Sequence, residues 1–194
     1  MSTMIFDREE VRDLAIAGIL LSTAFAILLT GGIAGLMKPS VTFIFAFGIS
    51  FLTAGTGFLL HELAHKMLAQ HYGLFARFRA FRGMLMLSVV LSFFGFIFAA
   101  PGAVFIKGVA SRQQNGRIAL AGPVANILLA GLFFLWQTAN PSSIIAVYGL
   151  NINALLALFN LLPVMPLDGA KVFAWNKVIF GSAIAVSALL FWFA

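Results

Sequence analysis

The sequence contains no cysteine and very little charge. Charged residues make up 9% of its 194 residues, whereas a soluble domain carries about 25%. The missing cysteines exclude disulfides and thiolate metal sites, so any metal must be held by histidine, aspartate or glutamate. Hydrophobic residues make up 62% of the chain, which is more apolar surface than a soluble globule of this size can bury. The composition therefore predicts an integral membrane protein.

The net charge is +6, but no basic domain stands apart from the apolar runs. Nucleic acid is therefore not expected as a partner. Lysine and arginine instead flank the apolar runs, and cytoplasmic loops of membrane proteins collect such residues. We expect the lipid bilayer to surround the chain and most of these basic residues to lie on the cytoplasmic side.

Five apolar runs predict membrane spans that together form a single domain over residues 1–194. A polar connection, Lys171–Lys177, precedes the last run. The expected fold is an all-α, multi-pass membrane protein with about five to six transmembrane helices. The predicted spans cover approximately residues 14–37, 41–70, 117–137, 143–163 and 178–194.

Residues 83–106 form a sixth apolar stretch that fits a single crossing poorly. A crossing would place three basic residues on each side of the membrane, against the tendency of positive charge to stay inside. The stretch is too short to cross twice as helices, and Ala100-Pro101-Gly102 is a turn signal. We therefore expect a small membrane-associated β-hairpin or re-entrant segment after the second helix. The flanking basic residues are Arg77, Arg79, Arg82, Lys107, Arg112 and Arg117.

Beyond Asp13, the chain has only two acidic residues, Glu62 and Asp168, and both lie in or beside apolar runs. An intramembrane carboxylate is costly and is typical of a functional site. Glu62 lies within His61-Glu62-Leu63-Ala64-His65, an H-E-x-x-H pattern. Residues four apart share one helix face, so both imidazoles can meet one ion. The intervening Glu62 can then act as general base on a metal-activated water.

A catalytic zinc site needs a third protein ligand and one open position. His71 is one candidate, but a continuing helix would place it on a different face, further along the axis. Asp168 is the stronger candidate, because Pro163, Pro166 and Gly169 unwind the chain around it and can turn its carboxylate inward. We therefore predict His61, His65 and Asp168 as ligands of one Zn²⁺ ion.

Three motifs, in this order, resemble those of the site-2 protease family of intramembrane zinc metalloproteases. They are His61–His65, the A-G-P-x-x-N stretch that ends at Asn126, and the N-x-x-P-x-x-P-x-D-G stretch from Asn160 to Gly169. The resemblance implies a three-helix catalytic core, a zinc site that opens to the cytoplasmic side, and Glu62 as the catalytic carboxylate. It also implies a membrane-associated β-region after the first motif.

The predicted function is zinc-dependent cleavage of transmembrane segments of membrane-protein substrates, in the manner of regulated intramembrane proteolysis. Asn126 and Asn160 are amides in apolar spans, and we expect them either to bind the unwound substrate or to join helices. Two other functions stay open. An ion transporter or channel would use Glu62 and Asp168 as ion ligands, and an inactive membrane-protein chaperone would retain a structural zinc.

Overall fold

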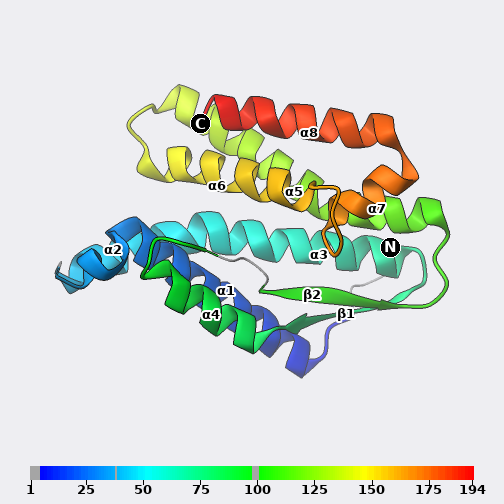
Figure 1. Ribbon diagram of the computed structural model, residues 1–194, viewed down its shortest axis with the longest axis horizontal. Coiled ribbons are helices and arrows are strands. Elements are labelled where there is room, and N and C mark those ends of the chain that lie inside the picture. The colour runs from blue at the N-terminus through cyan, green and yellow to red at the C-terminus, as the bar shows by residue number, and fades with distance from the viewer. Residues whose placement is uncertain (1–4, 38, 98–100) are drawn as a thin grey trace.

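The computed structural model describes residues 5–37, 39–97 and 101–194, and the chain is mostly helical (Figure 1). Two strands, β1 (Phe75–Ala80) and β2 (Gly102–Lys107), interrupt the helices. A 3₁₀ segment, η1 (Gly32–Met37), follows the first helix, and a π-helical turn, η2 (Phe51–Gly55), joins the second to the third. The helices are α1 (Arg8–Thr30), α2 (Ser40–Ser50), α3 (Thr56–His71), α4 (Arg82–Ser92), α5 (Arg112–Ala139), α6 (Ile144–Asn160), α7 (Asp168–Trp175) and α8 (Lys177–Trp192).

Helix α3 runs through the middle of the molecule (Figure 1). On one side it packs against α5, and α6, α7 and α8 lie on that same side. On the other side lie α1, α4 and the two strands. Buried side chains of α1, α3 and β1, among them Leu21, Phe58 and Phe78, form an apolar core there. The two faces of α3 therefore meet different surroundings.

Within the described residues, three helices are long and apolar enough to cross a membrane. They are α1, the continuous helix Ser40–His71 that contains α2, η2 and α3, and α5. The apolar helices α4, α6 and α8 are shorter. The structure thus confirms a predominantly helical protein of membrane type, and the total of five to six spans stays a prediction beyond these three.

The predicted hairpin within residues 83–106 is wrong in its pairing. The first part of this segment is helix α4, and only its end forms a strand, β2. Strand β2 pairs antiparallel with β1, which precedes the segment, so that Phe75 lies opposite Lys107. Pro101 lies directly before β2, and residues 98–100 lie outside the described residues. Arg77 and Arg79 lie within β1, although the sequence indicated them only as basic residues that flank the apolar stretch.

Carboxylates of α1 cover the outer edge of β1. The backbone N–H of Phe78 donates to Glu10 Oε1 at 2.8 Å, and that of Ala80 donates to Asp13 Oδ2 at 3.3 Å. Glu10 also forms an ion pair with Lys66 of α3, and both side chains are 1% exposed. These contacts hold α1, α3 and β1 together, although the sequence places the acidic residues in a polar N-terminal segment.

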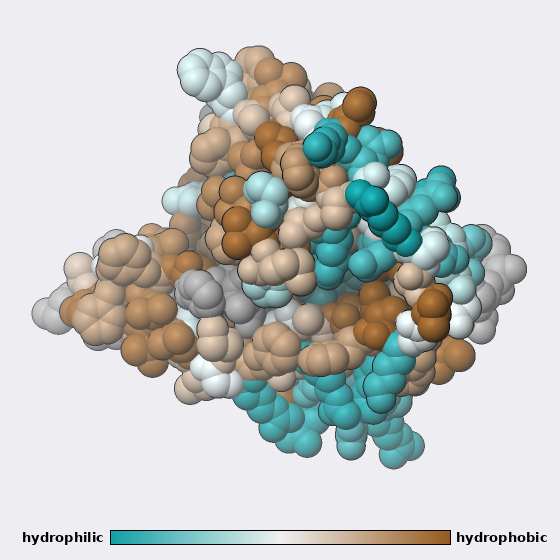
Figure 2. Space-filling view, turned by 45° about the vertical axis from the view of Figure 1, so that its right-hand side comes forward, coloured by the Kyte–Doolittle hydropathy of each residue, from teal (hydrophilic) through white to brown (hydrophobic). Residues whose placement is uncertain are grey.

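Hydrophilic side chains gather toward one end of the molecule. Figure 2 shows them on the side that comes forward from the right-hand end of Figure 1, where α3 ends and α5 begins. Hydrophobic side chains cover the rest of the face that this view presents. This segregation fits a molecule in which one end meets water and the remainder meets lipid.

Candidate metal and catalytic site

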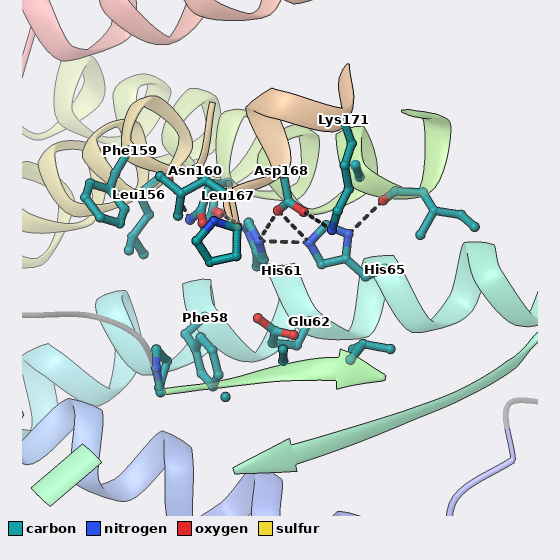
Figure 3. A pocket seen from close by; sticks show the side chains of 18 of the residues that line it. Phe58, His61, Glu62, His65, Leu156, Phe159, Asn160, Leu167, Asp168 and Lys171 are labelled. Carbon is teal, nitrogen blue, oxygen red and sulfur yellow. Dashed lines mark hydrogen bonds and ion pairs between the residues drawn. The ribbon is translucent and has the colours of Figure 1, made fainter. Parts of the chain in front are cut away.

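The two histidines of the H-E-x-x-H motif lie on one face of α3. The Nε2 atoms of His61 and His65 are 3.0 Å apart, and both side chains are buried. Oδ2 of Asp168, from α7, lies 3.3 Å from Nε2 of His61 and 3.0 Å from Nε2 of His65 (Figure 3). The structure therefore brings the three predicted ligands together, with their ligand atoms all within 4.8 Å of one another.

The chain between α6 and α7 carries Asp168 to this position. After α6 ends, Pro163 and Pro166 lie in turns rather than helix, and α7 begins at Asp168. A Cβ on Gly169 would lie 2.1 Å from the carbonyl oxygen of Leu161, so only glycine allows the two segments to approach this closely. The unwound end predicted from the prolines and glycine is confirmed, and it directs Asp168 toward α3.

Hydrogen bonds behind the imidazoles determine which nitrogen faces the ligand cluster. Nδ1 of His61 lies 2.6 Å from Asn126 Oδ1, while Asn126 Nδ2 donates to a carbonyl of α3 and to Asn153 Oδ1 at 3.0 Å. Since the amide nitrogen is the donor, its oxygen must accept, and Nδ1 of His61 carries the proton. Nδ1 of His65 donates to the carbonyl of Ile118 at 2.7 Å. Each Nε2 therefore keeps its lone pair for a metal.

Helix α5 approaches the imidazoles at a glycine. A Cβ on Gly122 would lie 2.3 Å from Nε2 of His65 and 2.5 Å from Nε2 of His61. Any side chain at this position would fill the space in which the ligand atoms converge. The A-G-P-x-x-N stretch thus contributes two residues to the site: Gly122 leaves room for the ligand atoms, and Asn126 orients His61 through a hydrogen bond.

Glu62 is buried and faces the strands, whereas the ligand atoms face α7 (Figure 3). The backbone of Val104 in β2 lies close to its carboxylate. A cavity of about 400 Å³ is lined by Glu62, by the three ligand residues and by apolar side chains that include Phe58 and Leu156. The potential general base and the ligand cluster therefore share one largely apolar cavity.

Strand β2 presents a free edge to this cavity. Phe78 and Ala80 of β1 direct their N–H groups to α1, so these residues form non-hydrogen-bonded pairs with their partners in β2. Those partners, Val104 and Gly102, must direct their backbone groups away from β1. Ile106, two residues after Val104, directs its backbone groups the same way. All three residues of β2 line the cavity.

Asp168 offers one carboxylate oxygen, Oδ2, to the cluster. The ionised carboxylate is the form that binds a metal.

The remaining predicted residues differ in their surroundings. Asn126 is fully buried, and its amide is engaged with other parts of the protein. Asn160 lines the cavity and donates from Nδ2 to the carbonyl of Leu156 at 2.9 Å. A substrate contact by either amide stays a prediction. His71, the other candidate ligand, is exposed at the end of α3 and is not part of the ligand cluster.

Two polar residues near the cluster were missed from the sequence. Asn153 of α6 is fully buried and supports Asn126. Lys171 of α7 lines the cavity, with Nζ 3.7 Å from Asp168 Oδ1. Asn153 could have been found as another amide within an apolar run. Lys171 carried no such signal, because it belongs to a polar connection.

The residues present fit a zinc ion. Two imidazole nitrogens and one carboxylate oxygen form a ligand set of the kind that catalytic zinc sites use, with one further position open. Both Nε2 atoms are free to bind, and a glycine lies where any side chain would block them. The cluster can therefore hold one zinc ion per chain.

Comparison with known proteins points to the same chemistry. The chain is 39% identical over 185 residues to "Putative zinc metalloprotease MJ0611" of Methanocaldococcus jannaschii, with 92% of this chain and 91% of the relative covered. It is 32% identical over 130 residues to "Putative zinc metalloprotease Rip3" of Mycobacterium tuberculosis, covering 61% of this chain and 29% of that relative. No family model and no solved structure matches the chain.

The first of these relatives matches nearly the whole chain, and the three motifs that resemble the site-2 proteases meet at one ligand cluster. Zinc is the metal that both relatives' names give. The chain therefore belongs to the site-2 protease family of zinc metalloproteases.

Proposed function

We propose that this protein is a zinc-dependent endopeptidase that cleaves transmembrane segments of membrane-protein substrates. The observation that carries the proposal is the convergence of His61, His65 and Asp168 beside Glu62 in one cavity. That cavity is lined by residues of α1, α3 and α5, which belong to helices long and apolar enough to cross a membrane. This arrangement supports peptide-bond hydrolysis among membrane-embedded helices.

Zinc, when bound, activates a water molecule as nucleophile and polarises the carbonyl of the peptide bond. Glu62 takes the proton of the attacking water and returns it to the leaving amine. Its position between the two histidines, with its carboxylate in the same cavity, suits this role. Asn126 and the Ile118 carbonyl keep the imidazoles turned toward the metal.

A substrate helix must unwind before cleavage, because its carbonyl groups are hydrogen-bonded within the helix. We expect the unwound segment to extend along the free edge of β2, where the backbone groups of Gly102 and Ile106 flank Val104. The apolar walls of the cavity would receive hydrophobic side chains of the substrate. Asn160 lines the same cavity and has an amide that can bind the extended backbone.

We further propose that the chain crosses the membrane several times and that the cavity opens to the cytoplasmic side. The basic residues that flank the apolar runs favour this orientation. His61 lies ten residues before the end of α3 at His71, or roughly 15 Å along the helix. A short polar channel at that end would bring water to the site.

Purified protein incubated with single-span substrates tests the proposal. Glu62→Gln should lower the cleavage rate by about 10²–10⁴-fold, because it removes the general base, and should retain zinc. Asp168→Ala should lose both zinc and cleavage. His71→Ala is the matched control, since this histidine lies on the same helix but is exposed; it should change neither quantity.

Cleavage that survives Glu62→Gln would contradict the assigned base. Zinc retained by Asp168→Ala and lost from His71→Ala would contradict the ligand assignment. Ion flux into liposomes without any cleavage would support a transporter or channel instead. A cellular function that persists in Glu62→Gln would support a chaperone.

A further inference from the structure

A lysine side chain lies beside the ligand cluster. Among the described residues that line the cavity, Lys171 is the one lysine or arginine. Its Nζ is 3.7 Å from Oδ1 of Asp168, three residues earlier on α7. The other carboxylate oxygen, Oδ2, faces the two imidazoles. The two oxygens of Asp168 therefore have different partners.

Helix α7 is anchored at both ends, so Asp168 and Lys171 keep their place over α3. At its start, Gly169 packs so closely against the end of α6 that a Cβ would lie 2.1 Å from a carbonyl oxygen. Near its end, Nε of Arg112 donates to the carbonyl of Ala174 at 2.7 Å. Both residues of the ion pair thus belong to a helix that contacts the rest of the protein near each end.

The placement of Lys171 does not favour metal affinity, because a positive charge close to a divalent cation repels it. Its contact with Oδ1 points instead to the geometry of Asp168. A carboxylate with both oxygens free can bind a metal through both of them. Bidentate binding would add a fifth ligand atom beside the position that a catalytic zinc site keeps for water.

We infer that Lys171 is a positioning residue that engages Oδ1 of Asp168, so that only Oδ2 binds the metal and the site, with its water, stays four-coordinate. The inference rests on the metallopeptidase function proposed above. It adds a residue whose role is to control the coordination number.

Cobalt substitution tests the inference without measuring activity, because the visible d–d absorption of Co²⁺ is stronger in four-coordinate tetrahedral sites than in five-coordinate ones. Lys171→Met should lower this absorption several-fold, because Asp168 then binds through both oxygens. Its Co²⁺ affinity should equal or exceed that of wild type. Lys171→Arg, which keeps the charge, should restore much of the wild-type absorption.

Lys177→Met is the matched control, because Lys177 is exposed and its Nζ lies 5.3 Å from the centre of the Phe173 ring. Its spectrum should match that of wild type. Lys171→Met should also lower kcat about 10–100-fold, as is typical when a partner of a metal ligand is removed, and should leave KM unchanged. Lys171→Gln gives the same readouts if the methionine variant does not fold.

Unchanged Co²⁺ absorption in Lys171→Met and Lys171→Gln would overturn the inference, whatever their activity. A Co²⁺ affinity reduced more than about tenfold in folded Lys171→Met would also overturn it, because it would show a role in affinity. A wild-type protein that binds neither Co²⁺ nor Zn²⁺ would instead overturn the metallopeptidase proposal itself. The two failures are therefore distinguishable.

Discussion

Two buried polar clusters lie on different sides of α3, and they differ in what they contain. On the strand side, the Lys66 ammonium faces the Glu10 carboxylate, and a backbone N–H supplies a second donor to Glu10. On the α7 side, two imidazole nitrogens and a carboxylate oxygen, all acceptors, face one another at 3.0–3.3 Å. In the first cluster, donors and acceptors from the protein satisfy one another, so no further ligand is needed. The second cluster contains only acceptors and therefore requires a cation. We call the Lys66–Glu10 group the balanced cluster, which stabilises the fold, and the His61–His65–Asp168 group the acceptor cluster, which indicates a metal site.

Gly122→Ala should break the acceptor cluster most completely. The added Cβ would lie 2.3 Å and 2.5 Å from the two Nε2 atoms, so zinc content and cleavage should both fall to background. Gly131→Ala is the matched control on the same helix, because its Cβ would meet nothing within 4 Å. Metal analysis of the purified variants checks this expectation, and full zinc occupancy in Gly122→Ala would show that the cluster is more open than its geometry indicates.

Lys66→Met should break the balanced cluster and leave the acceptor cluster intact. An unpaired Glu10 carboxylate would remain buried, at a cost of about 3–5 kcal/mol in the free energy of unfolding. Zinc per folded chain should stay at one. Unfolding of the purified protein in detergent measures the loss, and Glu10→Gln combined with Lys66→Met should recover most of it. A single variant as stable as wild type would mean that water reaches Glu10.

Asn126→Leu should weaken zinc binding by removing the hydrogen-bond partner of a ligand. Without the amide oxygen, Nδ1 of His61 loses its partner, and zinc affinity should fall about 10–100-fold. Competition with a zinc chelator measures the affinity. If Asn126 instead binds substrate, as the sequence also allowed, then KM would rise while the zinc affinity stayed unchanged.

Glu9→Gln should have the smallest effect, because the carboxylate lies in an exposed ion-pair network. Its Oε2 is 2.7 Å from Nη2 of Arg77 and 3.3 Å from Nη1 of Arg79. Exposed pairs contribute about 0–1 kcal/mol and are screened by salt. The loss of stability should therefore be small and should vanish at high ionic strength. A loss as large as that of Lys66→Met would remove the contrast between buried and exposed charges on α1.

The helices and the ligand cluster were predictable because their signals are local. Apolar runs marked the helices, and the i, i+4 spacing placed His61 and His65 on one face. Asp168 followed from the prolines and glycine that unwind its segment. The sheet was not predictable in the same way, because β1 and β2 are separated by α4 and pair through backbone groups that carry no sequence signal.

The burial of Glu10 and Asp13 was also hidden from the sequence. A carboxylate near the N-terminus is usually solvated, and these two are buried against Lys66, the backbone of β1 and the side chains of Arg79 and Arg82. The hydrogen bond from Asn153 to Asn126 depends likewise on how α5 and α6 pack. Such contacts arise from tertiary structure, so residue types and spacing cannot supply them.

The helices of this protein differ in length. The continuous helix Ser40–His71 has 32 residues, or about 48 Å, whereas α6 and α8 have 17 and 16 residues, or about 26 and 24 Å. Under the proposed multi-pass topology, α6 and α8 are shorter than a hydrocarbon layer of about 30 Å, and we expect the lipid beside them to thin. Since α6 carries cavity residues, the proposed cleavage is then expected to depend on the acyl-chain length of the lipid.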